Sequence, residues 1–161
     1  RPNFMAVGWI STVNLTPPML AIGIASHRCT AKSITMSGEF SICIPDVSMI
    51  EKTDYVGIVS GNKIDKSDVF DVFYGELKKA PMISQCPLCM ECRLEETVTL
   101  PSHTLFIGEV VGTYTEEKYL TDGKPDVRKI NPFTLTMPDN NYWTIGEVAG
   151  KAWNIGLNLK K

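Results

Sequence analysis

Residues 26–33 gather hydroxyl and positively charged side chains in one short stretch. They are Ser26, Arg28, Thr30, Lys32 and Ser33, with His27 as a possible further cation. The apolar run 19–25 before them predicts a buried strand, and a short helix ending at a glycine is expected after them. A strand that leads into a helix start directs backbone N–H groups, the helix dipole and cations at one place. The segment therefore predicts a cradle for a phosphate group carried by a ligand. The alternative is a polar loop in which Thr30 only caps the helix.

A second polar segment could complete such a cradle. Gly61 permits a close backbone approach, while Ser60 and Lys66 offer a hydroxyl and a cation. The alternative is a helix C-terminus followed by a solvated loop. The glycine patterns of nucleotide-triphosphate loops and of dinucleotide-binding folds are both absent from the sequence.

His103 stands at the expected start of a strand, where an imidazole could bond a substrate or a nicotinamide cofactor. The alternative is a surface histidine at a hairpin end. Glu109 lies six residues further along, roughly 20 Å away at the rise of a strand, so the two cannot act as an acid–base pair within one chain. No nucleophile, histidine and acid pattern of a hydrolase is visible.

Three cysteines recur at every third position, as Cys86, Cys89 and Cys92, which invites a metal or iron–sulfur interpretation. On a strand, Cys86 and Cys92 would face one side and Cys89 the other, so they could not close on one ion. Cys29 and Cys43 lie far away in the sequence. We therefore expect small buried thiols and no metal site.

The pattern of the chain predicts mostly strands. Strands are expected at Phe4–Val13, Met19–Ala25, Glu39–Ile44, Met90–Val98, Thr104–Tyr114, Trp143–Gly146 and Ala152–Leu159. Helices are expected at Thr30–Ser37, at 48–59 behind a capping box of Ser48 and Glu51, and at Ser67–Tyr74. Many strands with few helices indicate a closed or nearly closed antiparallel barrel. The strand 104–114 is apolar on both faces, so one face can line the barrel while a partner subunit covers the other.

Composition limits the classes of function. The chain has 161 residues, 43% hydrophobic, and is expected to form one domain over 1–161. Its net charge of −2 argues against a nucleic-acid partner. No apolar run is long enough to span a bilayer and no leader pattern opens the chain. The five cysteines then indicate reduced thiols in a cytoplasmic protein. The abrupt start at Arg1-Pro2-Asn3 suggests that an upstream strand is missing.

Several segments together resemble the flavin reductase-like family, and its flavoredoxins in particular. They are Asn3 to Ser11, Pro17-Pro18-Met19, Arg28-x-Thr30 with Ser33-Ile34, Gly38-Glu39-Phe40, Tyr55-Val56-Gly57 through Ser60-Gly61 to Asp65-Lys66, Cys86 through Glu91-Cys92, and His103 with Phe106 to Val110. The resemblance implies a mainly β fold, an FMN-binding split β-barrel of antiparallel, Greek-key-like topology. It also implies FMN as cofactor, NAD(P)H as co-substrate and a homodimer with the flavin near the subunit interface.

The same resemblance implies roles for individual residues. Met5, Trp9, Ser11 and Thr12 would flank the flavin ring. Ser26, Arg28, Thr30 and Ser33 would hold the ribityl chain and phosphate, with Ser60, Gly61 and Lys66 completing the site. Lys32 adds a cation, and His103 would lie near the ring and the approach of the pyridine nucleotide. The family commonly has aromatic residues where this chain has Cys29 and Ser67, and a further strand before Asn3.

Three functions follow as hypotheses. The first is an FMN-dependent oxidoreductase that moves hydride from NAD(P)H to FMN and electrons onward to a small-molecule or protein acceptor. The second is a flavoredoxin-like FMN electron carrier without NAD(P)H activity of its own. The third is a metal-binding module built on Cys86, Cys89 and Cys92. No residue that reads a ribose is identifiable, so NADH and NADPH are not distinguished.

Overall fold

The computed structural model describes residues 1–159 and is built around one antiparallel sheet of five strands, ordered β1-β2-β7-β6-β3. These strands are β1 (Ile10–Asn14), β2 (Met19–Ala25), β3 (Glu39–Ile44), β6 (Leu88–Thr99) and β7 (His103–Thr115). Two-stranded ribbons join β4 (Val72–Phe73) to β5 (Met82–Ile83), β8 (Leu120–Thr121) to β9 (Lys124–Pro125), and β10 (Phe133–Thr136) to β11 (Asn141–Thr144).

Short helices complete the chain. They are α1 (Cys29–Ser37), α2 (Ile50–Ile58) and α3 (Val127–Ile130), with 3-10 turns η1 (Val47–Met49), η2 (Glu117–Tyr119) and η3 (Ile155–Leu159). None of the helices within residues 1–159 combines the length and the apolar character needed to cross a membrane.

The central strands and the first helix agree with the sequence. The predicted strands 19–25 and 39–44 have the observed bounds, and α1 ends at Gly38, whose φ of 69° is the left-handed conformation that glycine tolerates. The long pair β6 and β7 forms a hairpin with two register shifts. Phe106 on β7 enters the core, as the alternation predicts, while Leu105 and Ile107 face the other way and stay half-buried.

Four predicted elements are wrong, two because of tertiary pairing and two because local hydrogen bonds decide otherwise. Of the strand Phe4–Val13, only the end from Ile10 onward belongs to β1, and the Trp9 carbonyl still accepts the Gly23 N–H of β2; residues 4–8 leave the sheet and cross it. Ser67–Tyr74 is no helix, because its end forms β4 against β5. Ala152–Leu159 has no partner strand and forms η3 with local hydrogen bonds. The capping box at Ser48 is replaced by Asp46, whose carboxylate accepts the Ser48 backbone N–H at 2.8 Å.

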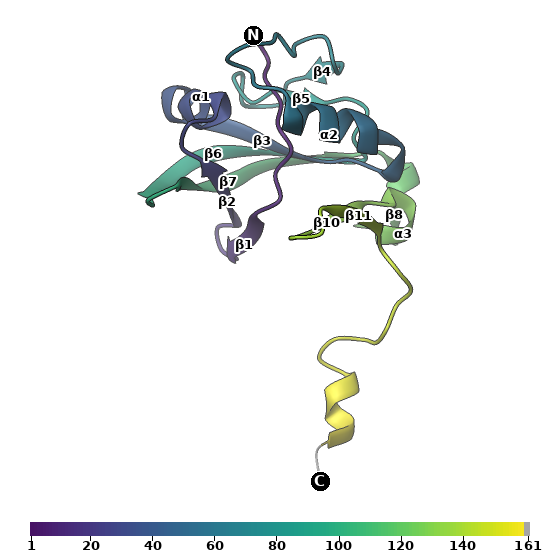
Figure 1. Ribbon diagram of the computed structural model, residues 1–161. Helices are drawn as coiled ribbons and strands as arrows, with labels where there is room; N and C mark the ends of the chain where they lie inside the picture. Colours follow the sequence, from purple (N-terminus) through teal and green to yellow (C-terminus); the bar gives the residue numbers. More distant parts are fainter. Residues whose placement is uncertain (160–161) are drawn as a thin grey trace.

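The crossing N-terminal segment divides the interior. In Figure 1 it descends between α1 and α2 over the face of the sheet. The main core lies between the sheet and α1, and contains Leu20, Ile22, Ile24, Ala31, Ile34, Phe40, Ile42, Cys92 and Phe106. A second cluster of Phe4, Met49, Val56 and Phe70 lies under α2. A cavity of about 340 Å³ lies where the crossing segment, α2 and the β10–β11 ribbon meet.

Glu91 is a fully buried carboxylate held by three donors. Its oxygens accept the backbone N–H groups of Glu76 at 2.9 Å and Leu77 at 2.8 Å, and the Tyr114 hydroxyl at 2.5 Å. Burial by itself would raise the pKa of Glu91, but the hydrogen bonds from Tyr114, Leu77 and Glu76 outweigh it and the pKa falls below its ordinary value. The ionised carboxylate therefore stabilises the fold.

Replacing this carboxylate should reduce stability and change its dependence on pH. We expect Glu91→Gln to lower the free energy of unfolding at pH 7 by about 3 kcal/mol, because charge-assisted bonds are lost in a buried place. A carboxylate with a lowered folded-state pKa stabilises above about pH 4.3, and this contribution disappears as the pH falls through the folded-state pKa. Urea titrations between pH 3 and 7 should therefore show the two proteins converging in acid. The exposed Glu96→Gln, on the same strand, should behave as wild type; an equal loss there contradicts the assignment.

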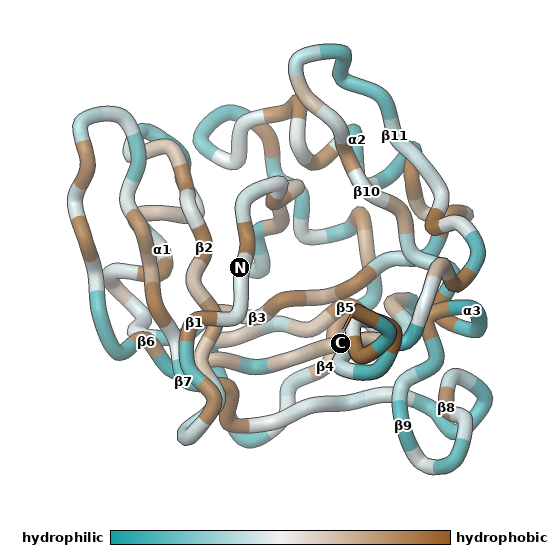
Figure 2. Tube along the Cα trace, turned by 90° about the horizontal axis from the view of Figure 1, so that it is seen from below, coloured by the Kyte–Doolittle hydropathy of each residue, from teal (hydrophilic) through white to brown (hydrophobic). Residues whose placement is uncertain are grey.

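The chain beyond β11 leaves the body. Figure 1 shows residues 145–159 extending away from the sheet to η3, and Figure 2 looks along this arm from below. Its apolar side chains face solvent: Val148, Trp153, Ile155, Leu157 and Leu159 are all at least half exposed, Trp153 almost completely. Backbone hydrogen bonds in η3 and the turn before it stay within the arm. Such a short helix has little stability of its own in water.

Candidate functional site

The two polar segments singled out in the sequence meet at one small pocket. Its walls come from Arg28 and the start of α1, from α2 and the loop after it, and from the N-terminal segment. The lining residues are Asn3, Met5, Arg28, Cys29, Thr30, Val56, Val59, Ser60, Gly61 and Lys66. Two cations, Arg28 and Lys66, and no acidic residue line it. The electrostatics of the pocket favour an anion.

The N-terminus of α1 opens at this pocket without a side-chain cap. The residue before the helix, Arg28, is extended with φ −72° and ψ 143°, and no side chain bonds the first N–H groups. Thr30 does not cap the helix; its hydroxyl instead accepts a hydrogen bond from the Asn3 amide at 2.8 Å. The free N–H groups and the positive end of the helix dipole are thus available to an anion.

Gly61 allows the opposite wall to come close. A Cβ built on this glycine would lie 2.2 Å from the Asn3 Oδ1, so a side chain at this position would push the Asn3 amide out of its place. Asn3 therefore joins the two predicted segments: its amide nitrogen holds Thr30, and its oxygen lies against the backbone of Gly61. Sequence reasoning quoted Asn3 in a motif but gave it no role, because only the crossing of the N-terminal segment brings it here.

Lys66 was expected to bind the phosphate with a free ammonium group, but its ammonium group is bound to the protein instead. Its Nζ donates to three backbone carbonyls, those of Phe4 at 2.6 Å, Val56 at 3.0 Å and Val59 at 3.1 Å. The side chain is buried, and burial is the main cause of its lowered pKa. Because three donors serve three carbonyls, Lys66 joins the N-terminal segment to α2 and the following loop, and contributes charge from beneath the pocket rather than a free ammonium group.

Three other residues of the predicted cradle lie outside the pocket lining. Ser26 shares a hydrogen bond of 3.2 Å with the Thr104 hydroxyl. Ser33 donates to the Cys29 carbonyl at 3.1 Å, within its own helix, and Lys32 is exposed on α1. Arg28 lies half-buried at the pocket, with one guanidinium nitrogen 3.5 Å from the Gly57 carbonyl oxygen. Of the cations predicted in 26–33, Arg28 is the one that lines the pocket.

The residues expected around a flavin ring form a second group. Trp9 and His103 are in contact, with ring centroids 4.4 Å apart and planes tilted by 41°. The His103 Nδ1 lies 2.9 Å from the Ser102 hydroxyl, which fixes the orientation of the imidazole. Met5 lines the pocket, so the N-terminal segment carries residues of both groups. Ser11 and Thr12 are exposed on β1, and the Ser11 hydroxyl donates to the Thr12 carbonyl.

The cysteines are arranged differently from the alternation expected of a strand. Cys86 lies before β6 and not within it, and is on the side of Cys89. Cys92 is buried in the main core, away from these two cysteines. Cys43, which sequence reasoning set aside as distant, is the direct partner of Cys89 across β3 and β6. Within residues 1–159, no group of three or more His, Cys, Asp or Glu side chains is arranged to hold a metal ion.

Comparison with known proteins agrees with this architecture. The family model of the flavin reductase like domain matches residues 1–135. The crystal structure of a flavoredoxin from Methanosarcina acetivorans is 51% identical, with a TM-score of 0.97 over 98% of this chain and 85% of that one. Flavoredoxin of Desulfovibrio vulgaris is 34% identical, with a TM-score of 0.90 over 97% of this chain and 85% of that one. An FMN-binding protein from Thermus thermophilus is 26% identical, with a TM-score of 0.70 over 76% of this chain and 68% of that one.

The family match covers both walls of the pocket and the Trp9–His103 pair. The predicted resemblance and the predicted split β-barrel, mainly β with few helices, are confirmed. The chain belongs to the flavin reductase-like family.

Proposed function

We propose that this protein binds FMN and acts as an oxidoreductase of the flavin reductase type, taking electrons from NAD(P)H and passing them to an acceptor. The observation that carries the proposal is the pocket in which the Arg28 guanidinium, the uncapped start of α1 and the backbone at Gly61 converge. The family and the similarity to flavoredoxins and to an FMN-binding protein support it.

The residues present fit the phosphate end of FMN. A phosphate monoester is nearly a dianion at neutral pH and needs both positive charge and several donors. Arg28 supplies a forked cation, α1 supplies backbone N–H groups, and the Ser60 and Thr30 hydroxyls stand at the two walls. Lys66 adds a buried charge beneath them. No carboxylate lines the pocket to oppose a dianion.

The Trp9 and His103 rings give the site a second, aromatic part. The bound cofactor supplies the hydride and single-electron chemistry, and the protein supplies its binding and orientation. Trp9 is half exposed, and packs against Gly23, where a Cβ would lie 3.4 Å from the indole. The half-buried indole edge and the His103 imidazole would orient a flat ligand beside β2 and β7. His103 is the residue we propose to contact the nicotinamide.

An absorbance spectrum of the purified protein tests cofactor binding directly. A flavin spectrum with FMN released on denaturation is the expected result; a colourless protein that does not take up added FMN contradicts the proposal. Anaerobic addition of NADH and, separately, NADPH should then bleach the flavin band. Bleaching by one of them identifies the donor.

A second function of the same site is favoured by the two flavoredoxin similarities, at 51% and 34% identity. In this alternative the protein is an FMN electron carrier that a redox protein reduces. The same anaerobic experiment separates the two: slow bleaching by both nicotinamides together with fast bleaching by a reduced ferredoxin selects the carrier.

We propose further that the protein is a homodimer in which the arm 145–159 packs on a second copy. The arm, β1 and the β10–β11 ribbon all lie on the lower side in Figure 1. Apolar residues there face solvent, among them Ile10, Val13, Leu15, Leu135, Trp143 and Ile145. A stable dimer buries on the order of 800 Å² per subunit, an area that the arm and this side can supply together. A two-fold axis lets each arm cover the other subunit.

Charge on the arm should break this association. We expect Trp153→Glu to shift the protein from dimer to monomer, because it places a carboxylate where an indole needs an apolar surface. Sedimentation or light scattering at several protein concentrations measures the shift. Lys151→Glu, on the same arm, changes a side chain that is already polar and should leave the dimer intact. A wild-type protein that is monomeric throughout contradicts the proposal.

A further inference from the structure

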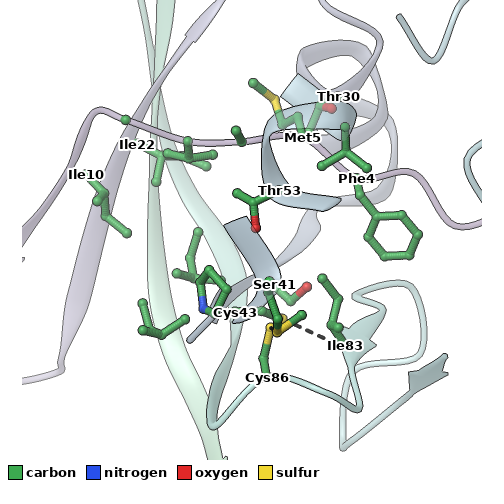
Figure 3. Close-up of a pocket in the computed structure, with 18 of the residues that line it drawn as sticks. Phe4, Met5, Ile10, Ile22, Thr30, Ser41, Cys43, Thr53, Ile83 and Cys86 are labelled. Atoms are coloured by element: carbon green, nitrogen blue, oxygen red, sulfur yellow. Dashed lines mark hydrogen bonds between the residues drawn. The ribbon is translucent and has the colours of Figure 1, made fainter. Parts of the chain in front are cut away.

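Three sulfur atoms from separate parts of the sequence meet beside the internal cavity. Cys43 on β3 is paired with Cys89 on β6, and Cys86 precedes β6. Figure 3 shows the Cys43 and Cys86 side chains together at the wall of the cavity, which both residues line. The lining of the proposed flavin pocket includes none of these three cysteines, although the pocket shares Asn3, Met5, Thr30 and Val56 with the cavity. The chemistry of the three cysteines does not depend on the proposed function.

The surroundings make Cys43 the thiolate of the group. The Ile83 backbone N–H donates to the Cys43 Sγ at 3.3 Å, as the dashed line in Figure 3 marks. The neighbouring Cys86 and Cys89 thiols, in that order, and the Ile83 N–H lower the pKa of Cys43 against the opposing effect of burial. The same arrangement raises the pKa values of Cys86 and Cys89, so those two remain thiols. One activated sulfur thus has two protonated neighbours.

Geometry favours Cys86 over Cys89 as the partner of Cys43 in a disulfide. Directly opposed residues on antiparallel strands hold their Cβ atoms about 4.5–5.5 Å apart, whereas a disulfide requires about 3.8 Å. Bonding Cys43 to Cys89 would therefore distort the ladder, and the Cys89 thiol already donates to the Ile83 carbonyl at 3.4 Å. Cys86 lies outside the ladder, in a turn where its N–H bonds the Ile83 carbonyl, and its sulfur is 4.0 Å from that of Met49. It can approach Cys43 without breaking sheet hydrogen bonds.

We propose that Cys43 and Cys86 form a peroxide-sensitive dithiol site, in which oxidation joins β3 to the segment before β6 by a disulfide. The Cys43 thiolate attacks one oxygen of hydrogen peroxide; the O–O bond breaks, hydroxide leaves and takes up a proton, and Cys43 becomes a sulfenic acid. The Cys86 thiol then loses its proton and attacks the Cys43 sulfur; the S–S bond forms and water leaves. Two thiols and one peroxide give one disulfide and two waters.

The test counts thiols after treatment of the native protein with hydrogen peroxide. Remaining thiols are alkylated in denaturant and the intact mass is measured. The expected result is a loss of two alkylation sites out of five, restored by dithiothreitol, with a linked peptide pair that contains Cys43 and Cys86. Peptide mapping of the wild type gives this answer even where a variant does not fold.

Variants then separate the proposed pair from the other thiols. Cys43→Ser and Cys86→Ser should each abolish the loss of two sites, whereas Cys89→Ser and the matched buried control Cys92→Ala should retain it. A disulfide to Cys89 or Cys29, a loss that persists in Cys86→Ser, or overoxidation of Cys43 with no linked peptide overturns the proposal. So does a wild-type protein that keeps all five thiols under peroxide.

Discussion

Arg28→Ala should purify largely without flavin, while the fold stays intact. Arg28 is the cation at the mouth of the pocket whose guanidinium is not committed to a buried bond: within residues 1–159 its one side-chain hydrogen bond, to the Gly57 carbonyl, is 3.5 Å long. Charge-assisted hydrogen bonds contribute about 1.5–3 kcal/mol, so their loss should weaken FMN binding by about 10- to 150-fold. Flavin content per chain, and titration of the flavin-free protein with FMN followed by fluorescence, measure the effect.

Comparison variants make this result specific. Arg93→Ala removes an arginine from β6 whose partner Glu109 is 3.7 Å away, and should leave the flavin content unchanged. Lys32→Ala tests the sequence-based prediction for a residue that the structure places on the exposed side of α1. We expect at most a few-fold change there, because its charge is screened by solvent. Full flavin content in Arg28→Ala would contradict the assignment of the pocket.

The bounds of a strand or helix could be predicted from the sequence where the residues at its ends stop the element. The run 19–25 ends at polar residues, and 39–44 stops at Pro45, so both strands have their predicted bounds. Gly38 ends α1 because glycine tolerates the left-handed backbone conformation found there, and a glycine at a helix end can be recognised in the sequence. The strand at 4–13 failed because its apolar composition also suits a segment that crosses the sheet. Burial alone does not distinguish these two environments.

The same distinction applies to the candidate site. That Arg28, Ser60, Gly61 and Lys66 belong together was predictable from residue chemistry and the family resemblance, and the structure brings them to one pocket. The roles of Asn3 and of the Lys66 ammonium group depend on where the chain crosses itself. The meeting of Cys43 with Cys86 and Cys89 likewise depends on the register of β3 against β6. Neither the crossing nor the register has a local signal in the sequence.

Lys66→Met should destabilise the protein even without flavin, which separates Lys66 from Arg28. Methionine matches the length of the lysine stem but leaves the carbonyls of Phe4, Val56 and Val59 without their buried donor. We expect a loss of about 3 kcal/mol in the free energy of unfolding, because each buried unsatisfied carbonyl costs about 1–3 kcal/mol and water will satisfy part of them. Flavin binding should fall as well, since the two walls of the pocket lose the bond that joins them.

Denaturation of the flavin-free variants by urea distinguishes the two roles. Arg28→Ala should unfold within about 0.5 kcal/mol of wild type, because it removes no buried hydrogen bond, while Lys66→Met unfolds at clearly lower urea. Lys63→Met, an exposed lysine in the same loop, is the matched control and should match wild type. If Lys66→Met instead kept full stability and lost only FMN, the lysine would be a direct phosphate ligand, as its sequence motif predicts. The three carbonyl bonds would then not be what holds the loop.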